Sequence, residues 1–108
     1  MDATFVQAGD SIDYTPGSDV AAGSVVILND LVTVATRPIK ANTLGALTAS
    51  GIFDFTKKAN EAIDAGTKVY WDSTNGYATA TSEGNTYIGK ATADAAAADA
   101  TVRVRMSQ

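Results

Sequence analysis

The sequence predicts an all-β domain with at most minor helix, built as a small antiparallel β-barrel or sandwich of about eight short strands. Three observations support this prediction. Short apolar or aromatic runs recur along the chain, several of them alternate apolar and polar side chains, and turn residues separate them. A length of 108 residues suits one domain with its own core. We expect residues 1–10 to form an N-terminal arm or edge strand and residues 11–108 to form the single β domain.

The first half of the chain contains three predicted strands. Residues 11–15 alternate between apolar and polar side chains, which is typical of a half-buried strand. Residues 24–28 are apolar without alternation, which predicts a strand buried on both faces. Asn29-Asp30 is a two-residue turn, and the apolar run 31–35 follows it, so these two strands should form a hairpin.

The middle of the chain combines a strand with a short predicted helical segment. Residues 47–56 read as one strand with a bulge or close approach at Gly51. Residues 57–64 carry apolar side chains at helical spacing, which predicts one or two helical turns with Thr56 as a possible N-cap.

The most aromatic strand follows a sharp turn at Ala65-Gly66. Glycine adopts positive φ at little cost, so this dipeptide favours a chain reversal. The strand after it contains Val69, Tyr70 and the chain's only tryptophan, Trp71, and should anchor the core. Looser copies of the same turn pattern occur at residues 20–24 and 39–43, where glycine or asparagine follows alanine. We interpret all three as one strand-entry device.

The last third of the chain predicts three more strands. Residues 77–81 and 86–92 are β-prone and are separated by turn residues. Residues 93–100 are rich in alanine and aspartate but lack large apolar side chains, so we expect a loop with at most one helical turn. Residues 101–106 alternate cleanly, with Arg103 and Arg105 on one face.

The composition excludes several classes of site. The chain has no cysteine and no histidine, which removes disulfides, thiolate metal sites and the commonest general base. Its net charge of −4 argues against broad binding to nucleic acid. No apolar run is long enough to span a membrane, and no signal peptide is expected. We therefore predict no cofactor, no metal, no nucleic-acid partner and no membrane partner.

One motif resembles a phosphate-binding loop. Residues 84–90 match the pattern G-x-x-x-x-G-K, with Gly89 and Lys90 in the closing positions. The next position is Ala91, which cannot ligate a metal, and the segment itself looks like a strand rather than a loop before a helix. We interpret it as a turn followed by a strand with a tight glycine.

Other candidate residues are charged or aromatic. Paired carboxylates for acid–base chemistry or Ca²⁺ would be Asp10 with Asp13, Asp64 with Asp72, and Asp94 with Asp99. Solvated turns explain these aspartates better. Arg103 and Arg105 would pair with acidic residues of a partner chain, the alternative being a solvated sheet face. Tyr70 and Trp71 point to opposite faces of a regular strand, so one of them is a candidate subunit contact.

The order of these pieces resembles a family of small tailed-phage proteins. The family was long described as a domain of unknown function and is often labelled a phage recombinase of RecA/RadA type, whereas its members are now described as capsid cement or head-decoration proteins. The resemblance runs along nearly the whole chain and rests on residues 5–7, 20–26, 51–57, 65–72, 84–91 and 102–105.

The resemblance implies a non-enzymatic virion protein, made in the bacterial host cytoplasm and located on the capsid surface. Its partner would be the phage major capsid protein. The protein itself would be a homotrimer of β-rich protomers with a β-clip-like fold. By this analogy Thr4, Phe5 and Val6 are the expected capsid-contacting arm. Another head or tail assembly role is the alternative, and a nucleotide-binding recombination protein is a third, which the failed phosphate-loop match disfavours.

Overall fold

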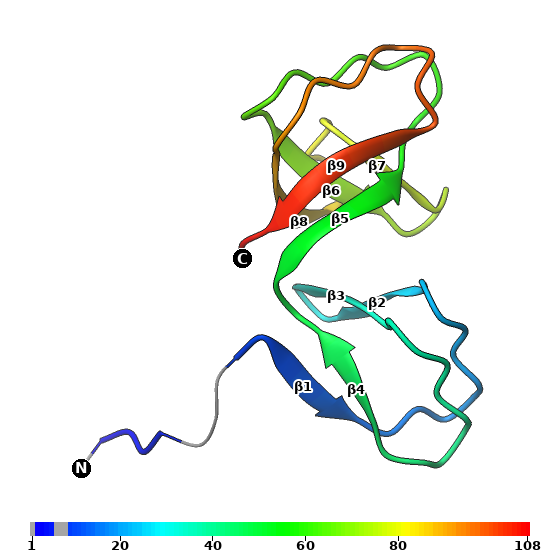
Figure 1. Ribbon diagram of the computed structural model, residues 1–108, viewed down its shortest axis with the longest axis vertical. Helices are drawn as coiled ribbons and strands as arrows, with labels where there is room; N and C mark the ends of the chain where they lie inside the picture. Colours follow the sequence, from blue (N-terminus) through cyan, green and yellow to red (C-terminus); the bar gives the residue numbers. More distant parts are fainter. Residues whose placement is uncertain (1, 6–8) are drawn as a thin grey trace.

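The computed structural model describes residues 2–5 and 9–108, and within them the chain is all β (Figure 1). The described residues contain no helix and form nine strands. Their bounds are β1 Ser11–Tyr14, β2 Val25–Leu28, β3 Leu31–Val34, β4 Gly45–Thr48, β5 Gly51–Thr56, β6 Lys68–Asp72, β7 Tyr77–Thr79, β8 Thr86–Ala91 and β9 Thr101–Met106.

The strands form two antiparallel sheets, one above the other in Figure 1. The first has four strands in the order β1-β4-β3-β2, and the second has five in the order β5-β9-β8-β6-β7. Neither sheet closes on itself, so the barrel alternative is wrong and the architecture is sandwich-like. The edge strands of the second sheet, β5 and β7, do not pair with each other along their length. One isolated bridge links Lys57, the residue after β5, to Ala78 of β7.

Most of the predicted strands are confirmed, and the Asn29-Asp30 hairpin joins β2 to β3 as expected. Asn29 carries the positive φ that the turn requires, at 56°. The prediction that β2 is buried on both faces is wrong, because all four of its residues are half-buried. This strand lies at the edge of its sheet, where part of each side chain remains accessible to solvent.

The three predicted strand-entry turns are confirmed. Their left-handed residues have similar φ values: Gly23 at 84°, Gly66 at 87° and Asn42 at 62°. In each turn the next residue donates its N–H to the carbonyl three positions back, as in a type II turn. These bonds are Ser24 to Ala21 at 3.2 Å, Thr67 to Asp64 at 3.1 Å and Thr43 to Lys40 at 3.2 Å.

The single strand predicted over residues 47–56 is wrong, because two strands occupy it. β4 ends at Thr48 in the first sheet and β5 begins at Gly51 in the second. Gly51 has φ +123°, which side-chain-bearing residues rarely adopt, and this conformation redirects the chain between the sheets. The glycine therefore marks a crossing between layers rather than a bulge within one strand.

The helical turns predicted over residues 57–64 are also wrong. The segment is an irregular loop that begins with the bridge at Lys57 and includes a second isolated bridge between Ile63 and Ala95. Asn60 adopts φ 62° and donates its N–H to the carbonyl of Ala97 at 3.1 Å. The apolar residues of this segment do not form one face of a helix. Ile63 is 1% exposed and packs into the main core from within the loop.

Lys57 holds this loop through an unusual buried ammonium. The residue is only 5% exposed, and its Nζ donates to the carbonyls of Lys58 at 2.9 Å, Glu61 at 2.6 Å and Ala97 at 3.3 Å. Three carbonyl dipoles thus replace the water that the ammonium loses on burial. The loop after β5 and the loop before β9 are tied together at one point.

The main hydrophobic core joins the two sheets. Buried side chains of β5, β6, β8 and β9 form most of it, and Val32 and Val34 of β3 insert into the same cluster. A second, smaller cluster centres on Leu47, Ile39 and Ala35. It lies on the face of the first sheet opposite to that of Val32 and Val34. Because β3 contributes to the larger core, the four-stranded sheet packs on the five-stranded one instead of forming a separate unit.

Gln108 adds a polar link between the sheets. Its side-chain amide accepts a hydrogen bond from the N–H of Val32 at 2.6 Å and donates one to the carbonyl of Val32 at 2.9 Å. The amide side chain therefore pairs with β3 in the way that a neighbouring strand would. The segment after β9 is consequently fastened to the first sheet.

Candidate functional site

The outward face of the five-stranded sheet carries the charged residues that the sequence singled out. Along β9, Val102, Val104 and Met106 are buried, whereas Arg103 and Arg105 are exposed. The predicted alternation of this strand is therefore confirmed. On β5 the same face carries Ile52 and Asp54, which are both exposed.

Arg103 is engaged within its own chain. Its Nε lies 3.0 Å from Oδ1 of Asp54 on the neighbouring strand β5, and its Nη2 lies 3.2 Å from Oδ2. The two residues are directly opposite in the β5–β9 register. The hydrogen bond from Arg103 lowers the pKa of Asp54 below its ordinary value of 3.8, and the positive charge of Arg103 adds to this effect.

The depressed pKa of Asp54 gives a prediction with a definite sign. The contribution of this carboxylate to stability is present above pH 3.8 and is lost as the pH falls through its lower folded value. Replacing Arg103 with glutamine should return the Asp54 titration toward its ordinary range, as followed by carboxyl chemical shifts in NMR. An Asp54 titration that is the same in both proteins would contradict the ion pair.

Tyr70 and Trp71 lie on opposite faces of β6. The Tyr70 ring packs against Tyr87 of β8 with centroids 5.5 Å apart, on the face away from the core. Trp71 packs against Phe55 with centroids 6.1 Å apart and contacts the main core. Both side chains are half-buried, so the prediction that the tryptophan strand anchors the core is met mainly by Val69, which is fully buried.

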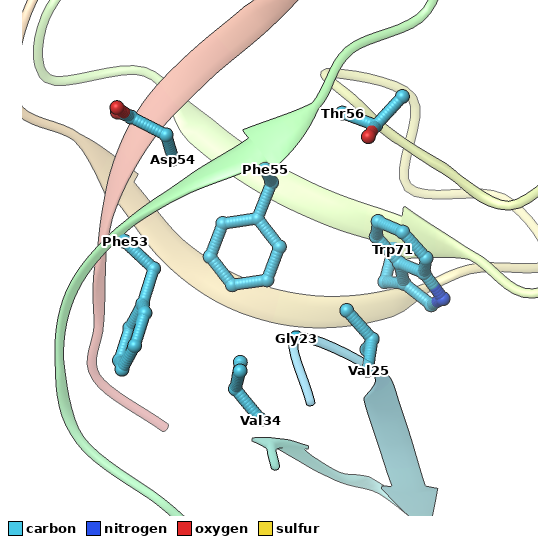
Figure 2. A pocket seen from close by; sticks show the side chains of 8 residues that line it. All are labelled: Gly23, Val25, Val34, Phe53, Asp54, Phe55, Thr56 and Trp71. Atoms are coloured by element: carbon cyan, nitrogen blue, oxygen red, sulfur yellow. The ribbon is translucent and has the colours of Figure 1, made fainter. Parts of the chain in front are cut away.

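Trp71 also lines a hollow of about 350 Å³ between the two sheets (Figure 2). Val25 and Val34 face it from the first sheet, and Phe53 and Phe55 face it from β5. Figure 2 shows Asp54 pointing away from the hollow, on the other side of β5. The lining is therefore mainly apolar and holds no arrangement of acid, base and nucleophile.

The segment that matches a phosphate-binding loop is a turn followed by a strand, as interpreted. Gly84 has φ +74° in the turn, and Thr86–Ala91 is strand β8. Gly89 lies within that strand, opposite Met106 of β9. The backbone amides of this segment are thus in a sheet, where they cannot surround a phosphate.

Most of the paired aspartates serve turns and loops, whereas Asp13 lies within strand β1. Asp72 accepts hydrogen bonds from the N–H groups of Thr74 and Asn75, both at 3.0 Å, and from the Asn75 side chain at 2.8 Å. These bonds lower the pKa of Asp72, the Asn75 side chain contributing most. The other hydrogen-bonded members are Asp10 with the Ser50 hydroxyl at 2.9 Å, Asp94 with Ala65 N–H at 2.8 Å and Asp99 with Ala96 N–H at 2.8 Å.

Residues 2–5 and 9–108 contain no group of three acidic side chains placed to hold a metal ion. The same residues include no helix that is long and apolar enough to cross a membrane.

The comparison with protein families decides the assignment. The model of the phage cement protein family matches residues 6–106, which is almost the whole chain. The chain belongs to the phage cement protein family. A phage cement protein has a structural, non-enzymatic role in the virion capsid, where it associates with capsid proteins. Searches among curated proteins and solved structures gave no significant match.

For this cement-family chain, the expected contact residues lie in three separate places. Thr4 and Phe5 belong to the exposed segment 2–5, in which Phe5 is 84% exposed, while Val6 lies outside the described residues. Trp71 is at the hollow between the sheets. Tyr70, Arg103 and Arg105 lie on the outer face of the second sheet. These residues are not brought together into one site.

Sequence reasoning missed two lysines that share the outer face with Arg105. In the sequence Lys90 stands out only as the end of the phosphate-loop match, and Lys68 only precedes the aromatic strand. Both are exposed, and they are directly opposite each other in the β6–β8 register. The alternation within each strand indicates that they face outward, but only the register between strands places them together.

Proposed function

We propose that this protein binds the outer surface of a phage capsid and stabilises it by bridging neighbouring major capsid subunits. The observation that supports the proposal is the cement-family match over residues 6–106, together with a rigid β domain whose polar side chains serve turns and sheet pairs. The protein would be made in the host cytoplasm and would act in the virion as a mechanical brace.

The exposed N-terminal segment is the proposed capsid-contacting element. Thr4, Phe5 and Val6 are the residues for this role, and an aromatic side chain that is 84% exposed, as Phe5 is, gains most from a partner surface. An extended segment can add a strand to a sheet of the partner, which supplies main-chain hydrogen bonds without a preformed pocket.

The proposed assembly is a homotrimer. Tyr70 and Trp71 are the candidate contacts between copies, because aromatic residues are enriched in protein interfaces. Arg103 already forms an ion pair with Asp54 of the same chain. It would therefore contact a partner copy as a member of that ion pair. Arg105 remains available for an acidic partner residue. A stable contact between protomers would bury roughly 1,000 Å² or more.

Multivalency supplies the strength of this mechanism. A trimer that contacts several capsid subunits at once makes its second and third contacts at high effective concentration. Each contact can then be weak while the assembled capsid still gains stability.

The test is cosedimentation of the purified protein with expanded phage shells from which it has been removed. We expect saturable binding to shells, no binding to isolated tails, and a solution mass near three protomers by light scattering. Binding to tails but not to shells would overturn the proposal in favour of a tail assembly role. A variant with Phe5 replaced by serine should bind shells more weakly than the wild type, since it removes the exposed aromatic group.

A further inference from the structure

Three cations form a row across the outer face of the five-stranded sheet. In the strand register Lys90 of β8 is directly opposite Arg105 of β9 on one side and Lys68 of β6 on the other. Opposite residues of antiparallel strands have Cβ atoms about 5 Å apart. Lys68, Lys90 and Arg105, which we call the basic row, therefore place three positive charges on adjacent strands.

All three side chains of the basic row point away from the core. Each is exposed and is followed or preceded by a buried core residue: Lys68 by Val69, Lys90 by Ala91, and Arg105 by Val104 and Met106. Because successive side chains of a strand alternate between faces, the row lies on the outer surface. The three residues of the row thus lie on three adjacent, hydrogen-bonded strands, β6, β8 and β9.

Within the described residues no acidic group forms an ion pair with the basic row. Across residues 2–5 and 9–108 the one ion pair is that between Arg103 and Asp54. Like charges that are directly opposite on a sheet destabilise it, so this arrangement works against the folded state. It is also unexpected in a chain whose net charge is −4. A partner of opposite charge would convert the unfavourable feature into a favourable one.

The neighbours of the row are those of a protein interface. The paired rings of Tyr70 and Tyr87, tilted at 59° to each other, lie beside it on the same face. Ile52, which is 58% exposed, is opposite Arg105 on β5. Aromatic and arginine side chains are enriched in protein interfaces, and an exposed isoleucine gains from burial there. The surface combines charge with apolar area on a rigid sheet.

We propose that the basic row binds a carboxylate-rich surface of the major capsid protein. The inference rests on the proposed function and adds to it the chemistry of the partner surface. It assigns Tyr70 and Arg105 to the capsid contact in place of a contact between copies. Carboxylates of that surface would pair with the three cations, while the tyrosine pair and Ile52 would pack against its apolar side chains. The negative net charge of the whole chain disfavours nucleic acid, because a long polyanion would also approach the acidic remainder of the surface.

The test is a charge reversal at the centre of the row. Lys90→Glu is compared with Lys40→Glu, which makes the same change in net charge at an exposed turn of the first sheet. Binding to expanded, DNA-free shells is measured by cosedimentation at low and high salt. We expect Lys90→Glu to weaken binding by about tenfold or more, and Lys40→Glu to change it by less than about twofold. Wild-type binding should weaken as salt increases.

A second readout separates binding from folding. Lys90→Glu should leave the Tm of the free protein unchanged or raised, because a glutamate between Lys68 and Arg105 replaces repulsion with attraction. Weaker shell binding with an undiminished Tm would support the proposal.

Each other outcome is decisive. Shell binding by Lys90→Glu equal to that of the wild type would overturn the basic-row proposal and leave the cement role standing. Row-dependent binding of the free protein to duplex DNA, with unchanged shell binding, would reassign the row to nucleic acid. Failure of the wild type to bind shells would remove the cement role and this inference with it.

Discussion

Replacing Gly89 with alanine is expected to destabilise the fold by about 3 kcal/mol or more. A Cβ at this position would overlap the carbonyl oxygen of Arg105, and would lie 2.9 Å from the carbonyl carbon of that residue and 3.0 Å from the nitrogen of Ser107. The obstructing atoms are backbone atoms of β9 and its continuation, so no side-chain rotation can relieve the overlap. Strands β8 and β9 would have to separate.

Chemical denaturation followed by tryptophan fluorescence measures this effect, since Trp71 packs on the same core. Gly17→Ala is the matched control, because a Cβ there would meet nothing within 4 Å and its φ is an ordinary one. We expect that control to remain within about 1 kcal/mol of the wild type. Equal stability of the two variants would show that β8 and β9 are not paired as described.

Replacing Lys57 with methionine is expected to cost about 2 kcal/mol or more. The methionine keeps the length of the side chain but leaves the carbonyls of Lys58, Glu61 and Ala97 without the ammonium that binds them. Amide hydrogen exchange should accelerate at Asn60 and Ile63, whose N–H groups bond across to the loop before β9.

Lys58→Met is the control for this change, since Lys58 is the adjacent lysine and is exposed. We expect its free energy of unfolding to stay within about 0.5 kcal/mol of the wild-type value. If the two variants were equally stable and exchanged alike, the buried ammonium would have no role in holding the two loops.

Features that depend on local chemistry were predictable from the sequence. Glycine or asparagine after alanine marked turns whose left-handed geometry is confirmed at Gly23, Asn42 and Gly66. Period-2 alternation predicted β9 to the residue, because the two faces of that strand meet core and solvent respectively. A missed turn carried a readable signal, since Lys58-Ala59-Asn60 repeats the tripeptide Lys40-Ala41-Asn42.

Features that depend on pairing between distant strands were not predictable. The apolar spacing in residues 57–64 resembles a short helix, but the bridges of Lys57 and Ile63 to distant segments override that local preference. Residues 47–56 form one continuous β-prone run in the sequence, so the change from the first sheet to the second near Gly51 could not be predicted. The basic row required the register of three strands, β6, β8 and β9, none of which the sequence alone aligns.

The central claim is that this protein strengthens a capsid, and the thermal disruption of expanded shells tests it most directly. DNA-filled expanded shells are heated with and without saturating purified protein. Their opening is followed by light scattering and by the accessibility of the packaged DNA to a dye. We predict that bound protein raises the disruption temperature, with the increase saturating at full occupancy. An unchanged disruption temperature on fully occupied shells would contradict the cement mechanism.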